Sequence, residues 1–420
     1  MEGILSFISV VSIVCMVAAL PLIIWHVGVG AMGLFRTKKP RKLENKLHRF
    51  AVITCARNEE AVIDGLLDSL RRQEYPRECY DVFVVADNCT DDTAEVARRH
   101  GARVFERFNK SQVGKGFALH WAFERLWQNY PGRYDAVAIF DADNLVAPDF
   151  LTKTNDALCS GADVIQGYRD SKNPRDSWVS GCYSLYWIGL MRFFHCARSN
   201  WGLPCQIGGT GFAFKMSAIQ PAGWNTRTLV EDGEFSVQQI LAGHKVVPVP
   251  DAVFYDEQPA TFSLSLRQRY RWVVGGMQCF RLYFRDALRI FRIKGSWGAL
   301  DAALYLALLP VLAILTVTGA AGSLALLFHP DTWQAAAIFV TASGVAGYLA
   351  MAGLALLVVL LEKRSLRDYW KAVLLFPLFM LPMAYLALAA MFRPTTEWRP
   401  IVHTKTSRIS DMEQHTEKAI

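Results

Sequence analysis

The residues best suited to metal chemistry are two carboxylates separated by a single residue. Asp141 and Asp143 stand in FDADN, directly after a short apolar run. Because Mg²⁺ and Mn²⁺ prefer oxygen ligands and are often shared with a diphosphate, this pair predicts a divalent metal beside a phosphorylated ligand. A solvated turn produces the same spacing, so the pair alone leaves both interpretations open.

Other apolar runs also end in polar residues. FAVITCA is followed by Arg57, Asn58, Glu59 and Glu60, and YDVFVVAD ends in Asp87 and is followed by Asn88 and Cys89. Carboxylates gathered at one edge repel one another unless a cation lies among them, so the set favours a functional site more than any single member does. Lys115, in a GKG turn before a predicted helix, offers an ammonium to phosphate, although an exposed turn explains it equally well.

Two further motifs combine acidic, cationic and aromatic groups. Glu231 and Asp232 begin an amphipathic pattern, where a carboxylate either acts as a base or simply complements the helix dipole. The stretch QRYRW holds Gln268, Arg271 and Trp272, with Arg269 as a second candidate cation. A planar guanidinium suits a diphosphate, and an indole face offers apolar contact to a sugar ring.

The segment that carries these residues alternates between strand and helix patterns. Strands are predicted at 50–56, 80–87, 102–108 and 134–144, and helices at 61–73, 90–101 and 114–130. This alternation predicts an α/β domain whose sheet is mostly parallel and covered by helices. Ligands of such sheets bind beyond the carboxyl ends of the strands, which is where the acidic residues stand.

Four uncharged apolar blocks flank this segment, at 4–25, 302–328, 335–361 and 372–392. Each is long enough to cross a hydrocarbon core of ~30 Å as a helix. The first is expected to be an uncleaved membrane helix, because neither a basic n-region nor a clear cleavage site accompanies it.

The distribution of positive charge predicts how the chain lies in a membrane. Residues 36–49 hold seven Lys and Arg against one Glu, residues 362–371 hold four against two acids, and residues 329–334 hold none. By the positive-inside rule, the chain is a multi-pass cell-membrane protein whose middle segment is cytoplasmic. Basic residues beside apolar blocks favour membrane lipids as partners and disfavour nucleic acid. The nine cysteines include no CxxC pair, so a zinc site is not expected.

Taken in order, the motifs resemble a known series. Asp87, the Asp141/Asp143 pair, Glu231–Asp232 and QRYRW resemble the D, DxD, [TE]D and QxxRW motifs of membrane-integrated family 2 glycosyltransferases, which include cellulose, chitin, hyaluronan and poly-N-acetylglucosamine synthases. The resemblance covers roughly residues 48–300 and the flanking apolar blocks. It implies a nucleotide-sugar-binding, GT-A-like domain with a mostly parallel mixed sheet, a UDP-sugar donor, an inverting transfer, and Mg²⁺ or Mn²⁺ as cofactor.

The resemblance also implies a role for each matching residue. Glu59 and Asp87 would line the nucleoside pocket, Lys115, Asp141, Gln268 and Arg271 would bind the donor diphosphate, Asp143 with Asp141 would hold the metal, Asp232 would be the general base, and Trp272 with Glu231 would contact the acceptor. Val230 departs from the pattern, where Thr often precedes Glu-Asp. These roles fit the chemistry, because a sugar hydroxyl is a poor nucleophile and the departing diphosphate gathers negative charge.

Five parts are expected along the chain: a transmembrane helix at 1–35, a cytoplasmic glycosyltransferase domain at 36–272, an amphipathic interfacial helix at 273–296, about three transmembrane helices at 297–392, and a tail at 393–420. The interfacial helix carries Arg281, Arg285, Arg289 and Arg292 on one face.

The tail resembles, through TEWRPIVHTKT with Trp398 and Lys405, a loop that closes over the nucleotide in relatives. Four crossings from an outside N-terminus would place that tail on the wrong side of the membrane for this role. Either the tail resemblance fails, or residues 372–392, which contain Pro377 and Pro382, do not cross.

Two functions use the same set of groups. The first is a processive synthase that extends a β-linked polysaccharide and exports it, with a saccharide as acceptor; QRYRW favours this interpretation. The alternative is a glycolipid synthase that adds a single sugar to a membrane lipid, which the small number of membrane helices favours. A catalytically inactive scaffold would lack at least one chemical group of the series, and none is missing here.

Overall fold

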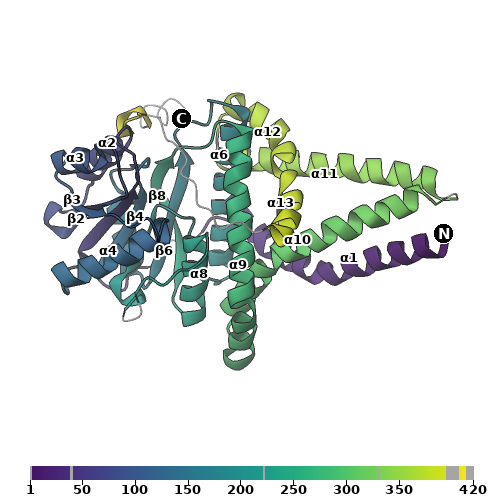
Figure 1. Cartoon of the computed structure of the whole chain (residues 1–420), viewed down its shortest axis with the longest axis horizontal. Coiled ribbons are helices and arrows are strands. Elements are labelled where there is room, and N and C mark those ends of the chain that lie inside the picture. Colours follow the sequence, from purple (N-terminus) through teal and green to yellow (C-terminus); the bar gives the residue numbers. More distant parts are fainter. Residues whose placement is uncertain (1, 38–40, 221–222, 330, 394–405, 413–420) are drawn as a thin grey trace.

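The computed structural model describes residues 2–37, 41–220, 223–329, 331–393 and 406–412. The middle of the chain forms an α/β domain, and three long helices extend away from one side of it (Figure 1). In the described part of the chain, four helical segments are long and apolar enough to span a membrane: 3–34, 297–327, 333–361 and 366–392.

A single eight-stranded sheet organises the α/β domain. Its strands are β1 (Phe50–Ala56), β2 (Tyr80–Asp87), β3 (Arg103–Arg107), β4 (Ala136–Asp141), β5 (Leu145–Val146), β6 (Val164–Ser171), β7 (Phe212–Lys215) and β8 (Val246–Asp256), in the spatial order β3-β2-β1-β4-β7-β6-β8-β5. The pairs β1–β2, β1–β4, β2–β3 and β6–β8 are parallel, whereas β7 runs antiparallel to both β4 and β6. The prediction of a mostly parallel mixed sheet is confirmed.

Helices cover both faces of this sheet. They are α2 (Ile63–Arg71), α3 (Thr93–Arg99), α4 (Lys115–Asn129), α5 (Phe150–Cys159) and α8 (Glu231–Ala242). One layer of the core centres on Trp224, which is 1% exposed and stacks on Phe235 with ring centroids 4.4 Å apart. On the opposite face, Phe140, Phe150 and Phe254 pack edge to face. The sheet is therefore buried on both sides, as strands of continuous apolar sequence require.

The remaining helices differ in part from the predicted ones. Helix α6 (Trp178–Leu190) continues through a π-helical turn (Met191–Cys196) into α7 (Ala197–Asn200). The interfacial helix predicted at 273–296 is part of a longer helix, α9 (Phe262–Lys294), which already contains QRYRW. The apolar segments form α1 (Glu2–Ala31), α10 (Trp297–Leu327), α11 (Trp333–Leu361), α12 (Leu366–Met380) and α13 (Pro382–Phe392).

A buried ion pair joins the first apolar helix, α1 (Glu2–Ala31), to the rest of the protein. Asp301 of α10 accepts hydrogen bonds from Arg198 Nε of α7 at 2.8 Å and from Trp25 Nε1 of α1 at 2.8 Å. Arg198 and Asp301 are 2% and 3% exposed, and the Arg198 guanidinium lies 3.6 Å from the centroid of the Phe194 ring. Removing one partner of such a pair leaves an uncompensated buried charge.

The Asp301→Ala substitution is therefore expected to lower the unfolding free energy by about 3–5 kcal/mol, because Arg198 keeps its charge and loses its partner. Thermal unfolding of the detergent-purified protein measures this effect. The control is Glu106→Gln, which removes the exposed Arg98–Glu106 pair and should cost less than about 1 kcal/mol. Equal losses for the two variants would contradict the fastening role of Asp301.

Candidate functional site

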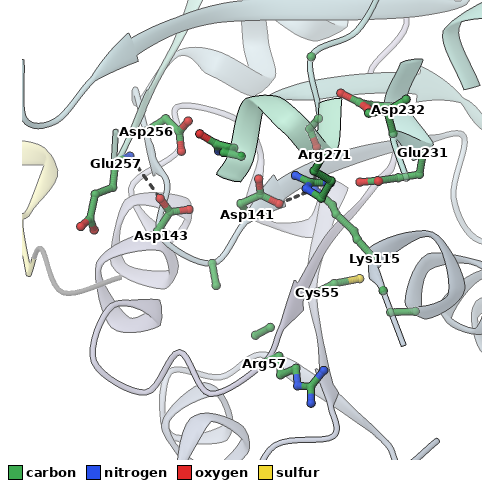
Figure 2. A pocket seen from close by; sticks show the side chains of 18 of the residues that line it. Cys55, Arg57, Lys115, Asp141, Asp143, Glu231, Asp232, Asp256, Glu257 and Arg271 are labelled. Carbon is green, nitrogen blue, oxygen red and sulfur yellow. Dashed lines mark hydrogen bonds and ion pairs between the residues drawn. The ribbon is translucent and has the colours of Figure 1, made fainter. Parts of the chain in front are cut away.

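A cavity of about 230 Å³ opens at the carboxyl ends of β1, β2 and β4 (Figure 2). Residues at the start of α4, in the β6–β7 region, at the start of α8, at the end of β8 and in α9 complete its wall. The residues to which the family resemblance assigns a role all line this one cavity: Glu59, Asp87, Lys115, Asp141, Asp143, Glu231, Asp232, Gln268, Arg271 and Trp272. Trp398 and Lys405 of the predicted closing loop lie outside the described residues.

The carboxylate pair after β4 is held by hydrogen bonds. Asp143 accepts from the Asn144 side-chain amide at 3.2 Å and from the Glu257 backbone N–H at 3.2 Å. The same Asn144 amide donates to Asp256 at 2.9 Å, so Asp143 and Asp256 lie on either side of it. Their oxygens are ligands of the type that Mg²⁺ and Mn²⁺ prefer. Within the described ranges, no three His, Cys, Asp or Glu side chains gather closely enough to hold a metal ion by themselves.

Lys115 lies between two groups of acids (Figure 2). Its ammonium donates to the Asp141 carboxylate and, at 2.6 Å, to the Gly209 carbonyl. Burial lowers the pKa of Lys115, but the charges of Asp141 and Glu231 outweigh that effect and raise the pKa above its ordinary value. The ammonium is therefore a permanent positive charge inside the cavity.

Glu231 and Asp232 begin α8, as predicted, and are half-buried. Burial and the neighbouring Asp232 raise the pKa of Glu231 to about 7, although Lys115 and Arg271 act in the opposite direction. Two adjacent carboxylates in a confined space repel each other when both are ionised, so Glu231 is protonated for part of the time at neutral pH.

Helix α9 contacts the loop that directly precedes these acids in the chain and contains Leu229 and Val230. Arg271 Nη1 donates to the Leu229 carbonyl at 2.9 Å, and the Gln278 side chain accepts from the Leu229 N–H at 2.9 Å. Gly275 faces Val230 so closely that a Cβ added at Gly275 would lie 2.7 Å from the Val230 side chain. The loop and the helix are thus in direct contact from Leu229 onward.

At the far end of the cavity, Asp87 is paired with Arg107 at 2.6 Å, and both residues are buried. Burial raises the pKa of Asp87, and Arg107 partly offsets this shift. Glu59, Arg57 and Cys55 line the same end. Burial also raises the pKa of the Cys55 thiol to about 12, so this cysteine is not a thiolate nucleophile.

Trp272, the predicted acceptor contact, lines the aromatic end of the cavity. Trp272 packs among Tyr183, Tyr186 and Trp187, with centroid distances of 6.2, 6.5 and 5.5 Å. The Trp187 ring also lines the cavity and carries the Arg169 guanidinium 3.9 Å from its centroid. Trp272 therefore belongs to an aromatic cluster, and both Trp272 and Trp187 of this cluster line the cavity.

One predicted cation does not belong to the site. Arg269, the second candidate for the diphosphate, is 3% exposed, donates to the Phe379 carbonyl of α12, and does not line the cavity. Gln268 and Arg271 are three positions apart, which is less than one helical turn, and they face the cavity together with Trp272. Arg269 points to another side of α9.

Sequence reasoning missed four residues that line the cavity: Arg169, Trp187, Asp256 and Glu257. Arg169 contacts Asp256 at 3.4 Å and the Gly208 carbonyl, and Gln258 links Asp256 to Trp187 through its side-chain amide. Asp256 ends β8, so the strand-end rule that selected Asp141 also applies to it.

Comparisons with known proteins agree with this geometry. The chain is 27% identical over 303 residues to a beta-monoglucosyldiacylglycerol synthase of Nostoc sp., covering 68% of this chain and 62% of that protein. It is 29% identical over 177 residues to a probable glucomannan 4-beta-mannosyltransferase of Oryza sativa, covering 41% of this chain and 30% of that protein. The chain thus spans less than two thirds of the length of either relative.

Among solved structures, the mannosyltransferase PcManGT from Pyrobaculum calidifontis, in complex with GDP-Man and Mn²⁺, shares the fold with a TM-score of 0.59 and 18% identity. That likeness covers 92% of this chain and 100% of the other. Residues 48–275, more than half of the 420 residues, match the family described as glycosyltransferase like family 2. The chain belongs to this family and is a glycosyltransferase.

Proposed function

We propose that this enzyme is an inverting, metal-dependent glycosyltransferase that moves one sugar from a nucleoside-diphosphate sugar to a lipid acceptor in the membrane. The observation that carries the proposal is a single cavity whose walls combine strand-end carboxylates with residues of α9, the helix next to the apolar segments. The beta-monoglucosyldiacylglycerol synthase relative supports a lipid acceptor. A UDP-sugar remains the expected donor.

The side chains of the cavity divide between acceptor activation and leaving-group stabilisation. Asp232 is the proposed general base, which removes the proton of the acceptor hydroxyl as it attacks the anomeric carbon. Lys115, Arg271 and Gln268 are placed to bind the diphosphate, whose charge rises as the bond to the sugar breaks. Asp87 and Glu59 are the proposed nucleoside contacts at the far end, and Trp272 and Glu231 the acceptor contacts.

Asp143, with Asp141 beside it, would hold Mg²⁺ or Mn²⁺. A bound divalent ion would supply positive charge to the diphosphate. The two carboxylates do not complete a coordination shell, which leaves room for phosphate oxygens in the same shell. At Asp141 the ion would compete with the ammonium of Lys115, whereas Asp143 accepts from two neutral donors, the Asn144 amide and the Glu257 N–H.

The membrane helices favour a lipid acceptor over an exported polymer. Residues 338–350 of α11 are all exposed within the chain, and the Tyr348 hydroxyl donates to the Leu374 carbonyl of α12 at 2.5 Å, so the other described helices leave most of this half of α11 uncovered. A single copy therefore offers apolar surfaces there instead of a polar passage for a polysaccharide. Processive polysaccharide synthesis remains the second candidate, because the QRYRW motif is typical of processive synthases and the glucomannan synthase relative makes a polymer by name.

The membrane orientation proposed for the enzyme follows from charge. The exposed basic residues before β1 and along α9 lie close to the ends of the apolar helices, where anionic cytoplasmic lipids attract them. We propose that the α/β domain is cytoplasmic and that the donor is drawn from the cytoplasmic pool.

The product of the purified enzyme distinguishes the two candidates. Incubated with Mn²⁺, a panel of radiolabelled nucleotide sugars and vesicles containing diacylglycerol, it is expected to give a lipid-extractable product carrying one sugar. The Asp232→Asn variant should still bind donor but lose roughly 10²- to 10⁴-fold in transfer rate. Water-soluble product of high molecular weight would instead establish the polysaccharide synthase.

Metal dependence is expected to centre on Asp143. Replacing it by Asn removes a charged ligand, so the rate at saturating donor should fall roughly 100-fold and the Mn²⁺ concentration for half-maximal rate should rise. Nucleotide release at graded Mn²⁺ measures both effects. The control is Asp149→Asn, a half-buried residue that does not line the cavity. If Asp143→Asn keeps the metal dependence of the unaltered enzyme, the metal site lies elsewhere.

The raised pKa of Glu231 predicts a pH-dependent stability. The ordinary pKa is 4.5 and the folded value about 7, so the folded state binds more protons between these values and the stability falls as pH rises through this window. Without metal and donor, Glu231→Gln should raise the melting temperature at pH 8 and have less effect at pH 5. The exposed Glu124→Gln serves as control. A Glu231→Gln effect that is the same at both pH values would contradict the assignment.

A further inference from the structure

We propose that Arg169 is a positioning residue of the transfer reaction, which holds the Trp187 indole in the wall of the cavity and thereby sets where the acceptor hydroxyl lies relative to Asp232. The inference rests on the proposed function for two roles, Asp232 as the base and the aromatic end of the cavity as the acceptor side. Arg169 lies in β6, is 9% exposed and stands outside the motif series. It lines the cavity and contacts both an acid, Asp256, and the aromatic cluster, through Trp187.

The Trp187 ring is held both at its face and at its edge. The Arg169 guanidinium lies 3.9 Å from the ring centroid, a distance typical of a cation–π contact. At the edge, the indole Nε1–H donates to the Gln258 side-chain oxygen at 3.1 Å. Gln258 is itself 3% exposed, and its backbone N–H donates to the Asn173 side chain at 2.8 Å. The contacts at the face and at the edge together fix the orientation of the indole in the cavity wall.

Arg169 is itself held by two oxygen acceptors. Its Nη1 lies 3.4 Å from the Asp256 carboxylate, and its Nη2 donates to the Gly208 carbonyl. A planar guanidinium with partners on two nitrogens cannot rotate without losing one of them. Asp256 also accepts from the Asn144 side-chain amide at 2.9 Å, and the same amide donates to Asp143 at 3.2 Å (Figure 2). Arg169 thus links the aromatic wall of the cavity to the carboxylate proposed for the metal.

The glycine-containing loop before β7 brings Arg169 close to the proposed base. The Gly208 carbonyl accepts from Arg169, and the next carbonyl, that of Gly209, accepts from Lys115 at 2.6 Å. A Cβ added at Gly209 would lie 3.2 Å from Asp232 Oδ2 and 3.8 Å from Arg169 Nη2. Both side chains therefore lie next to the same small residue, yet among the described residues the ion pair of Arg169 is with an acid other than Asp232. Arg169 thus acts on the surroundings of the base through the loop and the aromatic wall.

Transfer to the acceptor depends on this wall more than hydrolysis of the donor does. The acceptor hydroxyl must lie within hydrogen-bond reach of Asp232 while its oxygen forms the bond to the anomeric carbon and the nucleoside diphosphate leaves. A water molecule can follow the same course, giving one proton to Asp232 and leaving free sugar as the product, and it needs no aromatic surface to reach the site. A displaced Trp187 therefore disfavours the acceptor and leaves water as its competitor. Arg169 thereby sets the ratio of transfer to hydrolysis.

The Arg169→Lys variant of the full-length enzyme tests this role, because lysine keeps the charge but loses the planar fork that reaches both Asp256 and Gly208. It is assayed with Mn²⁺, vesicles containing diacylglycerol and the radiolabelled nucleotide sugar that the unaltered enzyme accepts. The transfer rate should fall roughly 10- to 100-fold, and the ratio of free to transferred sugar should rise about tenfold or more, because a small displacement of a reacting group is costly. The KM for the donor should change less than about twofold, since the diphosphate contacts remain. Equal losses of transfer and hydrolysis would overturn the inference.

A second variant tests whether Arg169 acts through Trp187. Trp187→Phe removes the Nε1–H and part of the ring, so it should raise the same ratio of free to transferred sugar, and it serves as the test on its own if Arg169→Lys does not fold. In the double variant the ratio should stay within about twofold of the larger single effect, because both changes disturb one contact. Multiplied effects of the two changes would show independent roles and would overturn the inference.

Matched substitutions outside the cavity serve as controls. Arg175→Lys changes an exposed arginine that pairs with Asp368 at 2.6 Å, and Trp178→Phe changes a tryptophan of α6 that stacks on Phe262. Neither residue lines the cavity, so both variants should keep the rates and the ratio of the unaltered enzyme. The ratio is measured on whichever glycosylated product the unaltered enzyme forms. Polymer in place of glycolipid would refute the lipid acceptor, whereas an unchanged ratio in both Arg169→Lys and Trp187→Phe would refute the positioning role.

Discussion

The ammonium of Lys115 offsets a repulsion that would otherwise separate two halves of the site. It binds Asp141 at the end of β4 and the Gly209 carbonyl in the loop before β7, and its charge also acts on Glu231 at the start of α8. Without it, carboxylates from two different elements, β4 and α8, would face one another in a confined cavity. Lys115 therefore stabilises the close approach of β4, the loop before β7 and α8, together with Arg271, whose charge also acts on Glu231.

A second group of contacts joins this charged centre to the apolar helices α12 and α13. Arg271 and Gln278 hold the Leu229 backbone from one face of α9, while Arg269 and Tyr270 contact the backbone of α12 and the end of α13 from other faces. Helix α9 is thus a shared wall between the catalytic loop and the apolar segments. The proposed lipid acceptor would reach the site along this wall.

The sequence predicted the part of the fold whose elements are local and periodic. The strands β1, β2 and β4 end where their apolar runs end, so the residues that follow them could be assigned to one edge of the sheet from the pattern alone. Arg169 and Trp187 could not be found in this way, because β6 and α6 lack a clear period and their polar residues find partners only after folding. Hydropathy also could not decide whether residues 366–392 cross a membrane. A high mean hydropathy does not distinguish a helix packed against a protein surface from one surrounded by lipid.

Arg269 illustrates the same limit within a motif. Its type and position suggested an anion-binding residue, but a rotation of about 100° per residue along α9 separates neighbouring side chains onto different faces. The residue that reaches the cavity and the residue that anchors α12 are two positions apart. The packing of α9 against different neighbours on its different faces determines that Arg271 lines the cavity and that Arg269 contacts α12.

Gly275 has a consequence for how forces act within the protein. With no Cβ, it brings the backbone of α9 against Val230, the residue directly before the paired acids, and no gap separates them. A displacement of α9 at this point would therefore also move Val230 and the start of α8. Gly275 thus couples the position of α9 mechanically to the acids at the start of α8.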